Sequence, residues 1–320
     1  MIIMISPSVI SGAVLGWALG SNGAANCFAA AVSTRIIKYR TAIICTAVFV
    51  VLGACLEGSK GVQKISDYSY NSGINTPMKA FLVMLAAAIT ITIMTVMHLP
   101  VSTSQAVIGA ILGGALIEGK ANFSEMIKFF YAWFITPFGA IVIAFILYKS
   151  FEMFIEKRIK EYVVYENIIK IGYYISGIFS AYSLGGNNVA NVTAIYAGKI
   201  NLLTTNQAVL IGGITIALGV LTYSKGVMKT VGESLVTLSP VSGLISVLTG
   251  AIVVYVYALI GIPVSASHAI VGAVIGIGLV KGVNTIRIEA IRNISFGWFG
   301  TPTIAGIISL LFFSLFCLNS

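Results

Sequence analysis

Two stretches of the sequence place clustered hydroxyl side chains directly after a proline. They are Pro-Val-Ser-Thr-Ser-Gln-Ala at residues 100–106 and Pro-Val-Ser-Ala-Ser-His-Ala at residues 263–269. Followed by small apolar residues, this pattern predicts a helix start, because hydroxyl groups cap backbone N–H groups that have no partner. The free N–H groups and the positive dipole end of such a helix can bind an anion. The candidate anion ligands are Ser102, Thr103, Ser104, Ser265 and Ser267.

Asparagines form a second group of candidate ligands. They lie in Gly-Ser-Asn-Gly-Ala-Ala-Asn at residues 20–26 and in Gly-Gly-Asn-Asn-Val-Ala-Asn at residues 185–191. An amide side chain is costly in hydrocarbon unless it is paired, and it offers an oxygen to a cation and N–H groups to an anion. Hydrogen bonding between closely packed helices is the alternative role.

His268 lies inside the second hydroxyl motif, where the first motif has Gln105. A histidine at this place can donate a hydrogen bond to an anion or carry a coupled proton, and a packed neutral histidine is the open alternative. The four cysteines lie in apolar stretches without metal-ligand spacing, and the chain has no GxSxG, HExxH or P-loop motif. We therefore expect neither an enzyme nor a metal site, and no cofactor besides a coupling ion.

The elements that carry these motifs are strongly apolar. Of 320 residues, 58% are hydrophobic and 9% are charged, and the mean hydropathy is +0.99. Soluble domains have about 25% charged residues, so the composition predicts an integral membrane protein built from helices. The net charge of +9 is scattered through short loops, which argues against nucleic-acid binding and suits a protein beside anionic lipid. We expect a multi-pass protein of the cell membrane.

The chain is a tandem duplication. The asparagine motif recurs 165 positions later, the hydroxyl motif 163 positions later, and Ser-Lys-Gly-Val at residues 59–62 recurs at residues 224–227. Trp133 and Pro137 likewise recur as Trp298 and Pro302. One hydroxyl cluster would more simply bond back to its own helix, but two matched copies favour a binding role. The predicted organisation is a first repeat at residues 1–150, a charged linker at 151–166 and a second repeat at 167–320.

Short apolar segments occur at matching positions of the two halves. They are residues 24–37 and 101–117 in the first half and residues 188–198 and 264–280 in the second. Short or interrupted segments in corresponding places of two repeats indicate a transporter site near the middle of the bilayer. Two half-helix starts that meet there can surround a small oxyanion without an arginine.

These doubled motifs resemble those of the inorganic phosphate transporter family (PiT or PHO4), which has two copies of G-A-N-D-V-A-N-A and two of P-V-S-T-T-H-A. The resemblance covers essentially the whole chain. It implies an all-α integral membrane protein whose two homologous halves form an inverted repeat, with about 10–12 membrane helices including broken or re-entrant half-helices. It also implies a homodimer that takes up phosphate with Na⁺ or H⁺. By that likeness Asn22, Asn26, Asn187 and Asn191 fall on ion- and substrate-site positions, and the hydroxyl residues fall on the helix ends that face the anion. With the residue chemistry above, we assign Asn22, Asn187 and Asn188 to the substrate and Asn26, Asn191 and His268 to the coupling ion.

The chain departs from the family pattern at the acidic positions. Gly23 and Asn188 stand where the family has aspartate, and Ala266 replaces one hydroxyl residue. An aspartate can accept a hydrogen bond from the P–OH group of phosphate, whereas it would repel sulfate, which carries no proton at pH 7. Phosphate is the leading substrate. Because both acids are missing, the alternative is that the protein is a sulfate permease of the same fold. The loss of both acids also weakens a Na⁺ site, which favours proton coupling through His268.

The predicted function is secondary active transport of a small tetrahedral oxyanion by alternating access. An anion channel that uses the same two helix ends as a filter is the candidate from another class, and coupled accumulation would exclude it. A membrane-embedded scaffold is a third candidate, but it would not need duplicated hydroxyl and amide clusters.

Overall fold

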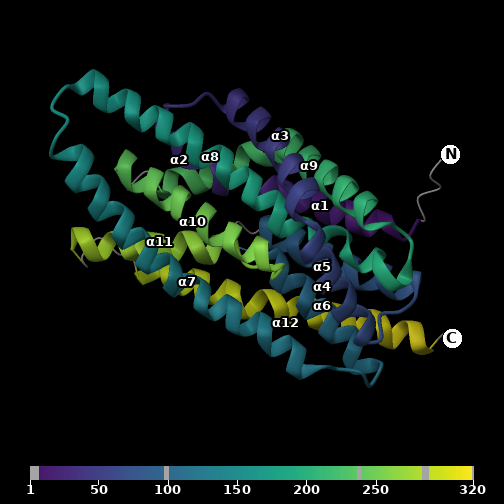
Figure 1. The fold of residues 1–320 in the computed structure, drawn as a ribbon. Helices are drawn as coiled ribbons and strands as arrows, with labels where there is room; N and C mark the ends of the chain where they lie inside the picture. Colours follow the sequence, from purple (N-terminus) through teal and green to yellow (C-terminus); the bar gives the residue numbers. More distant parts are fainter. Residues whose placement is uncertain (1–6, 97–100, 236–238, 283–287, 319–320) are drawn as a thin grey trace.

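The protein is a bundle of α-helices. The computed structural model describes residues 7–96, 101–235, 239–282 and 288–318, and no strand occurs in these ranges. In Figure 1 the long helices run roughly along the length of the molecule. The first half contains α1 (Val9–Gly23), α2 (Ala25–Ser33), α3 (Tyr39–Glu57), α4 (Ser59–Asn71), α5 (Pro77–Val96), α6 (Thr103–Ile117) and α7 (Phe123–Phe151). The second half contains α8 (Tyr162–Thr193), α9 (Thr205–Leu235), α10 (Pro240–Ile260), α11 (Ala266–Lys281) and α12 (Ile288–Leu318).

Within the described ranges, six helical segments are long and apolar enough to cross a bilayer. Large apolar side chains such as Phe134 and Leu315 point outward, as expected of surfaces that face lipid tails. Helices α6 and α11 are also apolar, but their 15 and 16 residues are too few for a full crossing. The predicted multi-pass membrane protein with short helices at the two hydroxyl motifs is therefore confirmed. The six segments are Tyr39–Glu57, Pro77–Val96, Phe123–Glu156, Thr205–Lys229, Pro240–Ile260 and Trp298–Leu318.

The two halves fold into matching elements. Helices α5, α6 and α7 correspond by sequence offset to α10, α11 and α12, and α3 with α4 corresponds to the single helix α9. Equivalent helices of the two halves make equivalent contacts with the opposite half. Helix α1 packs on α9, and its counterpart α8 packs on α3. Likewise α6 packs on α12, and its counterpart α11 packs on α7. Each half therefore completes the packing of the other, so one half alone would expose the faces that meet its counterpart.

The equivalent helices α3 and α9 run in opposite directions where they meet. A Cβ atom built on Gly58 would lie 3.3 Å from Val209, and one built on Gly213 would lie 3.0 Å from Ala54 and 3.4 Å from Val51. Residues nearer the start of α3 therefore contact residues further along α9, so the two helices are antiparallel. Two repeat-related helices that pack antiparallel are what an inverted repeat requires.

Most of the charged residues between the halves lie in the connection between two long helices, α7 and α8. After α7, a π-helical turn, η1, covers Glu152–Glu156, residues 157–161 follow without regular structure, and α8 begins at Tyr162. Lys157 forms an ion pair with Glu152 at 3.2 Å. Residues 151–166, the predicted linker, comprise the end of α7, this turn, the irregular residues and the first residues of α8.

Glycines allow the closest helix contacts. A side chain on Gly53 of α3 would collide with the carbonyl oxygen of Tyr182 on α8, and one on Gly20 of α1 would collide with that of Ile216 on α9. Membrane helices associate through such small-residue contacts because hydrocarbon provides no hydrophobic drive between them.

The Gly53→Ala substitution is expected to lower the free energy of unfolding by about 1–3 kcal/mol, because the two backbones must separate. Thermal unfolding of the detergent-purified protein measures this loss. Gly139→Ala in α7 is the control, since apart from the nearby backbone of α7 no atom of the described residues lies within 4 Å of its added Cβ. Equal melting temperatures for the two variants would contradict the packing argument.

Candidate functional site

Both hydroxyl motifs begin a helix as predicted. Ser102 and Ser265 have extended backbone and are the N-cap residues of α6 and α11. The Ser102 hydroxyl accepts the Gln105 N–H at 3.4 Å, and the Ser265 hydroxyl accepts the His268 N–H at 3.4 Å. Pro263 precedes α11 by three residues, and Pro100 lies outside the described residues. Each cap leaves other N–H groups of the first turn without a helical partner.

The two helix starts line one small pocket. It is formed by α1, α2, α6, α8 and α11, together with the residues just before α6 and α11, so both halves contribute. Of the described residues that line it, none has a charged side chain. These are Leu19, Asn22, Gly23, Asn26, Val101, Ser102, Thr103, Leu184, Asn188, Ser265, Ala266 and Ser267.

Many of the residues that line the pocket occupy equivalent positions in the two repeats. Four pairs of equivalent positions face the pocket together, so the pocket lies between the two repeats rather than inside one of them. Two of the pairs have the same residue type in both halves, and two have different residue types. The pairs are Leu19 with Leu184, Ser102 with Ser265, Gly23 with Asn188, and Thr103 with Ala266.

Asn188 brings an amide group to the pocket from α8. Its Oδ1 accepts a hydrogen bond from Nδ2 of Asn191 at 3.1 Å, and both residues are buried. The remaining amide atoms, Nδ2 of Asn188 and Oδ1 of Asn191, have no partner within the described part of the chain. A buried N–H group without a partner is costly, so a bound anion that accepts from Asn188 would relieve that cost.

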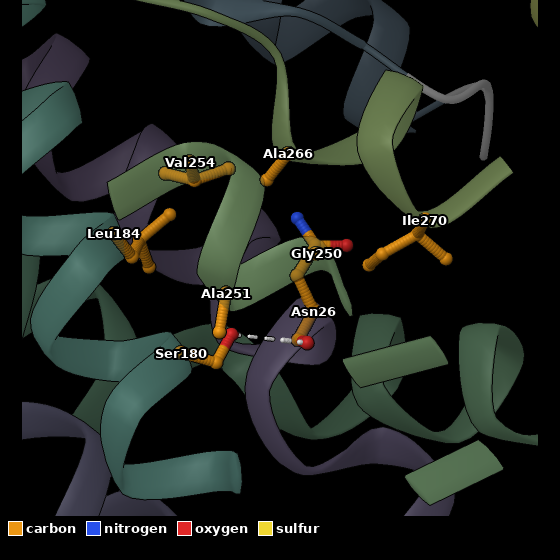
Figure 2. A pocket seen from close by; sticks show the side chains of 8 residues that line it. All are labelled: Asn26, Ser180, Leu184, Gly250, Ala251, Val254, Ala266 and Ile270. Atoms are coloured by element: carbon orange, nitrogen blue, oxygen red, sulfur yellow. Dashed lines mark hydrogen bonds between the residues drawn. The ribbon is translucent and has the colours of Figure 1, made fainter. Parts of the chain in front are cut away.

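Asn22 and Asn26 line the pocket from the first half and are half-buried. Nδ2 of Asn22 lies 3.4 Å from Oγ1 of Thr95 on α5. Asn26 also borders a second pocket, which shares Leu184 and Ala266 with the first. Figure 2 shows this second pocket, in which the Ser180 hydroxyl donates to the backbone oxygen of Asn26 at 3.4 Å. The two pockets therefore adjoin at Asn26, between α2, α8, α10 and α11.

The other predicted site residues are near the pocket but do not line it. Ser104 bonds to the Ser102 hydroxyl at 3.2 Å. The amide group of Asn187 binds the backbone before α11, donating to the Ile262 oxygen at 3.1 Å and accepting from the Val264 N–H at 3.0 Å. The geometry thus places Asn187 as a support for the start of α11.

His268 is buried one turn into α11. Nδ1 lies 3.5 Å from the carbonyl oxygen of Trp133, the ring centroid lies 4.0 Å from that of Trp298, and Nε2 has no partner within the described residues. The ring therefore packs behind the helix start, away from the lining.

Trp133 is a supporting residue to which sequence analysis assigned no role. Its indole Nε1 donates to the Pro263 oxygen at 3.1 Å. The recurrence of tryptophan at 133 and 298 was the available signal, but it does not tell which backbone atom the indole meets. Trp133 and Asn187 together hold the segment that leads into α11.

A helical membrane bundle with two half-helix starts at a shared, uncharged pocket defines a membrane transport protein for small ions. Residues 19–309 match the model of the phosphate transporter family, and the chain belongs to that family. The predicted family resemblance is confirmed.

Some relatives of the chain are named as phosphate permeases and one is named as a sulfate permease. It is 30% identical over 312 residues to a putative phosphate permease of Methanocaldococcus jannaschii, which covers 97% of both chains. It is 29% identical over 303 residues to the sulfate permease CysP of Bacillus subtilis, covering 93% of this chain and 84% of CysP. A solved structure titled "The sodium-dependent phosphate transporter" shares the fold, with a TM-score of 0.83, 22% identity, and coverage of 99% of this chain and 100% of that chain.

Proposed function

We propose that this protein is a secondary active transporter that carries a tetrahedral oxyanion, with phosphate as the first candidate, together with H⁺ or Na⁺. The observation that carries the proposal is the meeting of the α6 and α11 N-termini at one pocket. Each helix start has an effective charge of about +0.5, so two of them offset about one negative charge. The capping and neighbouring hydroxyls and the Asn188 amide add donors to the same space.

The packing of the halves supports alternating access. The antiparallel contact between α3 and α9 supports an inverted repeat, whose pseudo-two-fold axis would lie in the membrane plane. In such a protein, movement of one repeat against the other opens a central site to each side in turn. The pocket lies between the repeats, as this mechanism requires. A homodimer, which the family resemblance implies, belongs to the same proposal.

Sulfate is the second candidate substrate. Gly23 and Asn188 place no carboxylate in the pocket. No charged side chain of the described lining therefore accepts a hydrogen bond from the P–OH group of hydrogen phosphate or repels sulfate. The relative named as a sulfate permease agrees with this possibility. The neutral lining also gives Na⁺ only amide, hydroxyl and backbone oxygens, which favours H⁺ as the coupling ion.

Uptake by proteoliposomes tests the function. Labelled phosphate and labelled sulfate are each offered with an inward Na⁺ gradient and with an inward proton gradient. We expect phosphate to accumulate above its external concentration under one gradient, and an ionophore that collapses this gradient to abolish the accumulation. Downhill flux without accumulation would identify a channel instead. Sulfate uptake that excess phosphate does not inhibit would make sulfate the substrate.

A further inference from the structure

Two lysines of α4 bind the end of α10. Nζ of Lys60 donates to the Leu259 oxygen at 3.0 Å, and Nζ of Lys64 donates to the Ile260 oxygen at 2.6 Å. These carbonyl groups belong to the last turn of α10, where a helix has unpaired acceptors and the negative end of its dipole. The two cations are thus fixed at one place although their side chains are exposed.

This end of α10 leads directly into the anion-binding start of α11. Gly261 turns the chain with φ +70°, and the backbone of Lys60 occupies the space that a side chain there would need. The chain then passes Pro263 and reaches the N-cap Ser265. From Leu259 to Ser265 the chain advances six residues, which span at most about 22 Å even when fully extended. The carbonyl groups that the lysines bind are therefore within that distance of the pocket.

The lysine charges are not neutralised by ion pairs. Among the described residues the ion pairs are Lys79 with Glu118 and Lys157 with Glu152. Glu57, one turn before Lys60, accepts a hydrogen bond from the Tyr182 hydroxyl at 3.0 Å. A pocket whose described lining residues are uncharged therefore has two lysines, which form no ion pair within the described part of the chain, close to one side of it.

The same pair occurs in the other half. Lys60 and Lys64 correspond to Lys225 and Lys229, which lie on α9 at an offset of 165. Both halves keep two lysines at this spacing in a chain with only 9% charged residues. A role in each half of the transport cycle would account for the repetition.

We propose that Lys60 and Lys64 attract the tetrahedral dianion to the pocket through their charge while holding the segment that positions the start of α11. The proposal rests on the proposed function. Positive charge beside a cleft raises the local concentration of an anion, and the effect decreases as salt increases. A purely structural role would depend on the hydrogen bonds and not on ionic strength.

The double variant K60Q/K64Q separates these roles, because glutamine removes the charge, whereas K60R/K64R retains it. Initial uptake rates of the transported anion are measured at ionic strengths of about 0.02 and about 0.5 M, where the Debye length is about 20 and about 4 Å. K120Q/K128Q is the matched control, since it removes two exposed lysines near the start of α7.

At low ionic strength we expect K60Q/K64Q to raise KM about fivefold with less than about a twofold change in maximal rate, and the difference to vanish at high ionic strength. K60R/K64R and K120Q/K128Q should resemble the unmodified protein. An unchanged KM, an equal rise at both ionic strengths, loss of the maximal rate alone, or the same rise in the control would overturn the proposal. Absence of uptake by the unmodified protein would instead contradict the proposed function.

Discussion

Replacing Ser102 and Ser265 together by alanine is expected to lower the initial rate of anion uptake by a factor of about a hundred or more. Each serine caps its helix, and losing an N-cap costs about 1 kcal/mol. Each also faces the pocket, where a hydrogen bond to a charged ligand is worth about 1.5–3 kcal/mol. Since about 1.4 kcal/mol corresponds to a factor of ten, the two ligand bonds alone account for the expected loss.

Uptake by proteoliposomes at a low concentration of labelled anion measures this effect. Ser239→Ala is the matched control, because Ser239 caps the long helix α10 at 3.3 Å from the Ser242 N–H but does not line the pocket. The control should keep its transport rate. If the double variant transports as fast as the control, the two helix ends do not hold the substrate, and a scaffold role would gain support.

The Asn188→Asp substitution is expected to shift the preference between phosphate and sulfate toward phosphate. Asn188 lines the pocket, as does its repeat equivalent Gly23, so the new carboxylate would lie beside the bound anion. It can accept a hydrogen bond from the P–OH group of hydrogen phosphate but only repels sulfate, and placing like charges together costs several kcal/mol. We expect the ratio of phosphate to sulfate uptake to rise about tenfold or more, which corresponds to about 1.4 kcal/mol or more.

Competition between the two labelled anions at constant pH measures the ratio. Asn188→Ser is the control, because it shortens the same side chain without adding charge and should affect both anions alike. An unchanged ratio in Asn188→Asp would remove the electrostatic explanation for substrate choice. A fall in both rates without a change of ratio would show that the amide of Asn188 supports the fold rather than selects the anion.

The sequence by itself determined the membrane class, the duplication and the two helix starts. These features depend on composition, on recurrence within the chain, and on local capping by Ser102 and Ser265. Local interactions act over a few residues, so they can be predicted without knowledge of the packing. The equivalence of the two halves also led to the expectation that both would contribute to one site, and residues of both halves line one pocket.

Only the tertiary structure decided which side chains face the pocket. Asn187 and Asn188 are neighbours in the same motif, yet one binds the backbone before α11 and the other lines the pocket. Successive residues of a helix point about 100° apart, so the helix orientation, set by packing between the halves, separates their roles. The contacts of Trp133 with Pro263 and of Lys60 with Leu259 likewise join residues far apart in the chain. Such pairings follow from how the repeats dock, which local sequence does not encode.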